Sequence, residues 1–141
     1  MKHLPILLTV AAGISLAATA GSAQIVTSGQ WSLIEAEQVA GKHLFETHCV
    51  SCHGNQPGRS VLAPSLRGIV GRPAASLASF QYSDALKNSK LVWTEDNLRK
   101  WISDNAHMVP GTLMPHVSIS DPAEVIYLVE YLKTLKAPQK P

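Results

Sequence analysis

Apolar residues recur at helical spacing in three parts of the chain. The first part starts at Ser32-Leu33-Ile34-Glu35, whose serine and glutamate form a capping box, and runs to Cys49. The second starts at Thr94, and the third opens with Asp121 as N-cap and Pro122 at the first helical position. The pattern predicts one helix in each part. The apolar positions of these helices are Leu33, Ala36, Val39, Ala40, Leu44 and Phe45, then Leu98, Trp101 and Ile102, and finally Val125, Leu128, Val129, Leu132 and Leu135.

Irregular segments separate these helices. Residues 54–79 contain several glycines and prolines and show no strand alternation. Ser83-Asp84 can cap a short helical turn that includes Leu86, and a second loop follows over residues 107–120. The pattern indicates an all-α protein with about four to five short helices and long loops.

The amino terminus has the composition of an export signal. Lys2 lies in a short polar start, an uncharged apolar run covers residues 4–20, and small residues follow. We expect residues 1–23 to be a secretory signal peptide, cleaved after its last residue or after Ala20. A retained membrane anchor is the alternative, although the run is at the short end of what spans a bilayer.

The rest of the chain is long enough for one domain, which we expect over residues 24–137, followed by a flexible tail at 138–141. The whole chain has 12 lysines and arginines against 10 aspartates and glutamates, and the signal peptide contains one of the lysines. Such a balanced charge excludes the strongly basic surface typical of nucleic-acid binding.

The sequence Cys49-Val50-Ser51-Cys52-His53 contains both cysteines of the chain. This spacing is typical of covalent haem attachment, in which each thiol forms a thioether with one vinyl group and the histidine binds the iron. An exported, oxidising compartment suits this chemistry.

Three other interpretations of the motif fit the sequence less well. A disulfide between Cys49 and Cys52 would close a very small loop and stabilise little. A zinc site needs four ligands, usually as two well-separated pairs, and the chain has no second cysteine pair. A redox-active dithiol would follow a strand, whereas a helical pattern precedes this motif.

An iron held on one face by His53 needs a ligand on the other face, and Met114 is the best candidate. It lies in Pro110-Gly111-Thr112-Leu113-Met114-Pro115, where the two prolines restrict the backbone. A thioether favours ferrous iron and raises the reduction potential relative to two imidazoles. Met114 as a packing residue, with Met108 or His107 as the ligand, is the alternative.

Taken together, the chain resembles the class I cytochromes c, close to the mitochondrial-type branch and its bacterial relatives, over nearly all of its mature part. The matching segments are Gly41-x3-Phe45-x3-Cys49-x2-Cys52-His53, Ala63-Pro64-Ser65-Leu66-Arg67-Gly68, Phe80-Gln81-Tyr82-Ser83-Asp84-Ala85 with Trp93, Pro110-Gly111-Thr112-x-Met114, and Leu128-x2-Tyr131-Leu132. The resemblance implies that the chain has the cytochrome c fold around one covalent haem c. It also implies a close crossing of the first and last helices at Gly41.

The resemblance further implies roles for the residues around the haem. The Pro64 carbonyl would accept the free N–H of His53, and Tyr82 and Trp93 would donate to the inner propionate. Thr112 belongs to the methionine loop. Trp101 stands where the family commonly has a tyrosine near the methionine sulfur, and Leu86 replaces a usual asparagine. Four positions that carry lysines in mitochondrial members are occupied here by His48, Ala106, His107 and Leu113.

These features predict a single-electron carrier of a respiratory chain rather than an enzyme, exported to a bacterial periplasm. Its partners would be a periplasmic dehydrogenase, an oxidase or another cytochrome, and it could act freely or as an enzyme subunit. The alternative is a haem-based sensor or weak peroxidase whose Met114 leaves the iron. Trp31, Leu33 and Ile34 form either a docking patch for a larger complex or part of the core.

Overall fold

A computed structural model describes the backbone of residues 21–54, 62–117 and 119–137, and the side chains from Leu33 onward in these ranges. The described part is helical and contains no strand, only one isolated antiparallel bridge between Pro73 and Val92. Its five helices are α1 (Gly21–His48), α2 (Val50–His53), α3 (Asp84–Asn88), α4 (Glu95–Met108) and α5 (Pro122–Thr134). The all-α class is therefore confirmed.

Three of the predicted helix caps are present. The side chains of Ser83, Thr94 and Asp121 each accept a hydrogen bond from a backbone N–H in the first turn of α3, α4 and α5. Pro122 occupies the first turn of α5, as the sequence predicts.

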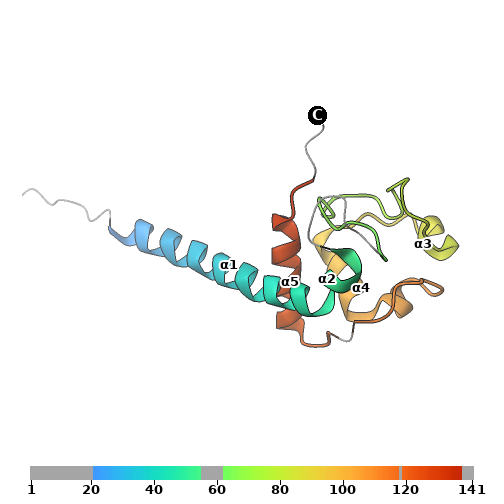
Figure 1. The fold of residues 1–141 in the computed structure, drawn as a ribbon. Helices are drawn as coiled ribbons and strands as arrows, with labels where there is room; N and C mark the ends of the chain where they lie inside the picture. Colours follow the sequence, from blue (N-terminus) through green and yellow to red (C-terminus); the bar gives the residue numbers. More distant parts are fainter. Residues whose placement is uncertain (1–20, 55–61, 118, 138–141) are drawn as a thin grey trace, which may run out of the picture.

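The predicted start of the first helix at Ser32 is wrong, because α1 begins at Gly21. A capping box is a local signal, and a helix continues through it when the preceding residues can also adopt helical backbone. The result is a helix of 28 residues that extends well beyond the other elements (Figure 1). No helix among the described residues is both long and apolar enough to cross a membrane.

Residues 1–20 and 138–141 lie outside the described backbone, so most of the expected signal peptide and the expected tail do too. The side chain of Trp31 is likewise not described. Leu33 is 67% exposed, so it does not pack into the core. Val39 is 71% exposed, and its predicted place on the apolar face is also wrong.

The carboxyl-terminal part of α1 crosses α5 (Figure 1). A Cβ atom on Gly41 would lie 1.8 Å from the backbone oxygen of Tyr127 and 2.9 Å from Cβ of Tyr131, so only glycine allows this approach. Next to the crossing, the rings of Phe45 and Tyr131 lie 5.3 Å apart. The expected close crossing at Gly41 is present in the structure.

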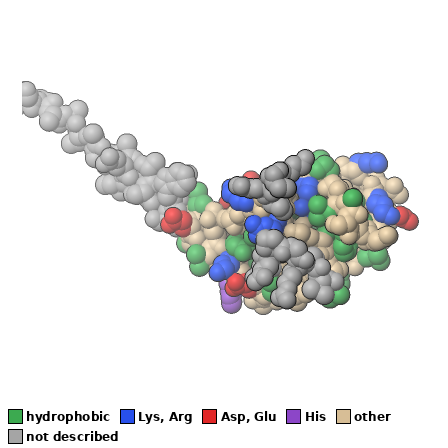
Figure 2. Space-filling model, turned by 45° about the horizontal axis from the view of Figure 1, so that its top comes forward, with side chains coloured by type: hydrophobic (Ala, Val, Ile, Leu, Met, Phe, Trp, Pro, Cys, Tyr) green, Lys and Arg blue, Asp and Glu red, His purple; other side chains and the backbone are tan. Residues whose placement is uncertain are grey.

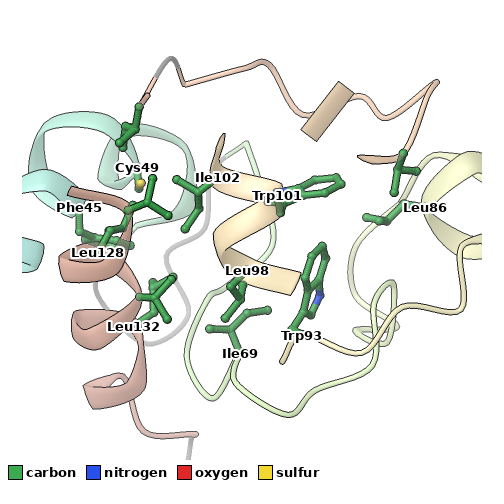
Figure 3. Packing of buried hydrophobic residues seen from close by; sticks show 14 residues of the cluster. Phe45, Cys49, Ile69, Leu86, Trp93, Leu98, Trp101, Ile102, Leu128 and Leu132 are labelled. Atoms are coloured by element: carbon green, nitrogen blue, oxygen red, sulfur yellow. The ribbon is translucent and has the colours of Figure 1, made fainter. Parts of the chain in front are cut away.

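One hydrophobic core joins this crossing to the loops and to α4 (Figure 3). Phe45, Leu128 and Val129 are almost fully buried on the α1–α5 side. On the other side Trp93 and Trp101 meet edge to face, with ring centroids 5.1 Å apart. The core therefore connects the end of α1, next to the cysteine motif, to α4.

Candidate functional site

The cysteine motif lies where α1 ends and α2 begins. Cys49 is buried between the two helices, Cys52 is half-buried in α2, and both thiols are free. Burial, together with the nearby Cys52, raises the pKa of Cys49 to about 11. A redox-active dithiol needs a lowered thiol pKa, so this environment does not favour that interpretation.

His53 is buried at the end of α2, and its Nδ1 lies 2.7 Å from the backbone oxygen of Pro64. A carbonyl only accepts, so Nδ1 carries the proton and donates it, and Nε2 keeps its lone pair for a metal. Burial is the main cause that lowers the pKa of His53, and it outweighs the opposing effect of the Pro64 hydrogen bond. The imidazole is therefore neutral near pH 7, as an iron ligand must be.

Across residues 21–54, 62–117 and 119–137, no three side chains of histidine, cysteine, aspartate or glutamate gather as a metal ion would require. The zinc interpretation therefore has no ligand set in this part of the chain.

Met114 is held at three atoms. Its sulfur lies 3.0 Å from Nε1 of Trp101, whose N–H donates to it. Its backbone oxygen accepts from Nδ2 of Asn105 at 2.7 Å, and its backbone nitrogen lies 3.4 Å from Oγ1 of Thr112. Trp101 and Asn105 are both buried on α4, so this helix fixes both the side chain and the backbone of Met114.

The two alternative ligands are not held in this way. His107 is exposed near the end of α4. Met108 lines a surface hollow that Ala85, Leu91 and Pro110 also line. Of the three candidates, Met114 has the most constrained position.

A cationic side chain that the sequence analysis did not single out lies near Tyr82. Arg72 is half-buried, and its guanidinium donates to the backbone oxygens of Ser65 at 2.8 Å and Arg67 at 3.0 Å. Burial lowers the pKa of Arg72 and raises that of Tyr82, and each group partly offsets the other's shift. Among the described residues Arg72 has no carboxylate partner.

A haem fits the donors of this site. A neutral buried imidazole and a fixed thioether suit its iron, two free thiols suit its vinyl groups, and the half-buried Arg72 suits a propionate. Arg72 is one of three arginines in the glycine- and proline-rich segment 54–79, so its sequence signal is weak, because many such cations face solvent.

The chain matches the family model described as Cytochrome c over residues 38–136. It is 42% identical over 100 residues to cytochrome c2 of Rhodopila globiformis, covering 71% of this chain and 94% of that protein. It is 35% identical over 96 residues to cytochrome c of Euglena viridis, covering 68% of this chain and 94% of that one.

Among solved structures the chain is similar to cytochrome cH from Methylobacterium extorquens, with a TM-score of 0.63 and 38% identity. The match covers 69% of this chain and 97% of that one. The matched family segment contains the cysteine motif, His53, Arg72 and Met114.

Proposed function

Because this chain belongs to the cytochrome c family as a class I monohaem cytochrome c, we propose that it carries single electrons through an iron held between His53 and Met114. The family binds haem c covalently, and Cys49 and Cys52 have the spacing that this attachment needs. When bound, the haem supplies a one-electron change between ferric and ferrous iron. The chain is an electron carrier, and we infer that it catalyses no reaction of its own.

The contact between Trp101 and the sulfur of Met114 is the observation that supports this proposal most directly. It holds the thioether in place, while the hydrogen bond from His53 to Pro64 fixes the imidazole. His53 and Met114 would together hold the iron and would leave no position for dioxygen or a substrate. Because both side chains are held by the protein, they would move little between redox states, and this would favour rapid electron transfer.

The residues on the propionate side complete the site. The Arg72 guanidinium would pair with a propionate carboxylate, and Tyr82 and Trp93 would donate hydrogen bonds to it. Arg72 is held by two backbone oxygens, so it keeps its position without a carboxylate from the protein. A fixed cation next to the haem favours the ferrous state, which carries one positive charge fewer.

A sensor or peroxidase would need Met114 to leave the iron. That step must break the sulfur contact with Trp101 and move a backbone held by Asn105. Neither Trp101, which contacts the sulfur of Met114, nor the buried Leu86 can act as a general acid or base.

The absorption spectrum of the ferrous protein with and without carbon monoxide tests the axial ligands. We expect no shift for the wild-type protein or for Met108→Leu, and a clear shift for Met114→Ala, because only the last variant opens the iron. A carbon monoxide adduct of the wild-type protein would favour the sensor or peroxidase instead. A carbon monoxide shift in Met108→Leu would mean that Met108, and not Met114, is the iron ligand.

We propose export to a bacterial periplasm, supported by the apolar run over residues 4–20 and by the oxidising chemistry of haem attachment. The mass of the purified protein tests this. Cleavage after Ala23 or Ala20 would give a soluble carrier, and an intact amino terminus would indicate a membrane-anchored one.

We also propose where partners dock. The residues around Met114 form an exposed rim, which we call the methionine rim and define as Ala106, His107, Leu113, Pro115 and His116. Leu113 is 79% exposed. From Trp101 to Leu132 the sequence contains no lysine or arginine, yet it contains aspartates and glutamates.

The chemistry of this rim sets the class of partner. Lysines on a carrier are matched by carboxylates on its partner, and the methionine rim offers no lysine for such a match. The partner, a dehydrogenase, an oxidase or another cytochrome, would therefore present an apolar surface with neutral or basic groups. The contact would be small and short-lived, as electron-transfer interfaces are. On the face drawn in Figure 2, basic and acidic side chains are interspersed.

A further inference from the structure

Helix α4 is interrupted close to the methionine loop. Asp104 has φ −159° and ψ 82°, so the helical hydrogen bonding breaks there and resumes in a final turn. The Asp104 side chain accepts a hydrogen bond from the backbone nitrogen of His107 at 2.9 Å, as an N-cap does. Asn105 is the first residue of this turn. It is 1% exposed, although both of its neighbours, Asp104 and Ala106, are exposed.

The buried amide of Asn105 contacts the backbone of the loop rather than another side chain. Its Nδ2 donates to the backbone oxygen of Met114, nine residues away, at 2.7 Å. Its Oδ1 is buried and has no hydrogen-bond partner among the described residues. A buried amide with one unsatisfied atom is costly, so its position is better explained by the single bond that it makes.

We propose that Asn105 is a positioning residue that retains Met114 as the iron ligand by holding its backbone oxygen. This inference rests on the proposed ligation by Met114. The same loop and the end of α4 contain other side chains that can bind iron, namely His107, Met108 and His116. A thioether is a comparatively weak ligand for ferric iron, and an imidazole that reaches the iron can replace it.

Trp101 and Asn105 then have separate effects. Trp101 donates to the sulfur, so it changes the electron density that the ligand gives to the iron. Asn105 touches only the backbone, so it changes how readily the loop moves away. Loss of Trp101 should therefore shift the reduction potential, and loss of Asn105 should mainly shift the equilibrium between bound and released Met114.

The test titrates the ferric holoprotein with imidazole and follows the near-infrared band that ferric haem shows with a thioether ligand. Asn105→Leu removes the donor and also the unsatisfied Oδ1, so the fold should lose little stability. We expect the imidazole concentration that displaces half of Met114 to fall about fivefold in Asn105→Leu and in Asn105→Ala. This factor corresponds to the free energy of one hydrogen bond.

Val129→Ala is the matched control, because it cuts a fully buried side chain on α5 and lowers global stability without touching Met114. We expect its imidazole midpoint to equal that of the wild-type protein, although its urea midpoint falls. Equal imidazole midpoints for the wild-type protein and both Asn105 variants would overturn the proposal. A shift in Val129→Ala as large as in Asn105→Leu would also overturn it, since loss of stability alone would then explain the result.

Failure of the proposed ligation gives a different result. The wild-type protein would then lack the near-infrared band, or Met114→Ala would retain it. Either result would rule out ligation by Met114 and, with it, the proposed role of Asn105. If Asn105→Leu and Asn105→Ala do not take up haem, Asn105→Ser replaces them. It has no group that reaches the Met114 oxygen at the same distance, and the same fall is expected.

Discussion

The indole nitrogen of Trp101 lies 3.0 Å from the sulfur of Met114. This pair joins the middle of α4 to the loop that carries the proposed ligand, and it replaces the tyrosine that the family commonly has. An N–H directed at a thioether withdraws electron density from the sulfur. As an iron ligand, the sulfur would then donate less to ferric iron, so the contact would favour the ferrous state.

The variant Trp101→Phe should therefore have a lower reduction potential. One hydrogen bond of about 0.5–1.5 kcal/mol corresponds to about 20–60 mV for a one-electron couple. Spectroelectrochemical titration of the wild-type protein and the variant measures the difference. Trp101→Tyr keeps a donor and should fall between the two, and a Trp101→Phe potential equal to or above that of the wild-type protein would contradict the argument.

Arg72 should also raise the potential, through its charge rather than through a ligand. The guanidinium is half-buried and has no carboxylate partner among the described residues, so its field is weakly screened inside the protein. Arg72→Leu should lower the potential by some tens of millivolts, about as much as Trp101→Phe.

The control is Lys87→Met, which removes one charge from an exposed ion pair with Asp84 on α3. It should leave the potential nearly unchanged, because exposed charges are screened by solvent. Equal effects of Arg72→Leu and Lys87→Met would mean that Arg72 has no special position at the site.

Gly41 should be the glycine least tolerant of substitution. A Cβ atom there would overlap the backbone of Tyr127, and backbone cannot move aside as a side chain can. Gly41→Ala should lower the free energy of unfolding by about 3 kcal/mol or more, since it pushes α1 and α5 apart. Urea denaturation followed by circular dichroism gives this value.

Gly71→Ala is the comparison for Gly41→Ala. Gly71 has φ +81°, yet nothing lies within 4 Å of its hypothetical Cβ. We expect a loss of about 1–2 kcal/mol from backbone strain alone. If the free energy of unfolding fell equally in both variants, the overlap of a Cβ atom at Gly41 with the backbone of Tyr127 would not explain the loss.

The sequence predicts those parts of the molecule that depend on local pattern. Ser83, Thr94 and Asp121 each cap the helix that follows, and Gly41 lies at the crossing that the resemblance implies. Local pattern also led to the error at Ser32, because a capping box does not tell whether helical backbone already precedes it.

The missed residues depend on contacts between distant segments. Asn105 follows Trp101 and Ile102 at helical spacing on the buried face of α4, but an asparagine adds no apolar signal, and its contact with Met114 required the fold. In the sequence Arg72 does not differ from other arginines in loops. Only the structure shows that the backbone oxygens of Ser65 and Arg67 accept hydrogen bonds from its guanidinium. The resemblance indicated that Trp101 replaces a tyrosine near the methionine sulfur, but the hydrogen bond between Trp101 and the sulfur became visible only in the fold.

The buried His53 predicts a loss of stability in acid. Its pKa is lowered from the ordinary value of 6.5, mainly by burial, so the folded chain binds fewer protons here than the unfolded chain. The stabilisation is fully present above that ordinary value and is lost as the pH falls through the lowered one. The free energy of unfolding should thus fall as the pH drops below the ordinary value of 6.5, and ligation of Nε2 by an iron would act in the same direction, because a ligating imidazole must be unprotonated.

Urea titrations from about pH 7 downward measure how the free energy of unfolding changes with pH, and His48→Gln is the control because His48 is exposed at the end of α1. The slope should be the same in the wild-type protein and in His48→Gln. A free energy of unfolding that stays constant as the pH falls would show that protonation of His53 is not linked to unfolding.

Salt dependence tests the methionine rim without a known partner. Small oxidants of opposite charge, the hexacyanoferrate(III) anion and the tris(phenanthroline)cobalt(III) cation, accept electrons at the exposed part of the haem. A surface rich in lysine would give a rate with the anion that falls steeply as salt is added. Since the methionine rim contains no lysine, we expect the rate with the anion to stay level or rise with salt, and the rate with the cation to stay level or fall.

Adding one positive charge to the rim should reverse this behaviour. Leu113→Lys should speed reduction of the anion about threefold to tenfold at low salt, and added salt should remove the gain. Val39→Lys makes the same change at an exposed position on α1 and should have little effect, because it lies outside the rim. If Val39→Lys speeds the reaction as much as Leu113→Lys, electrons do not leave through the methionine rim, and partners must be sought on another face.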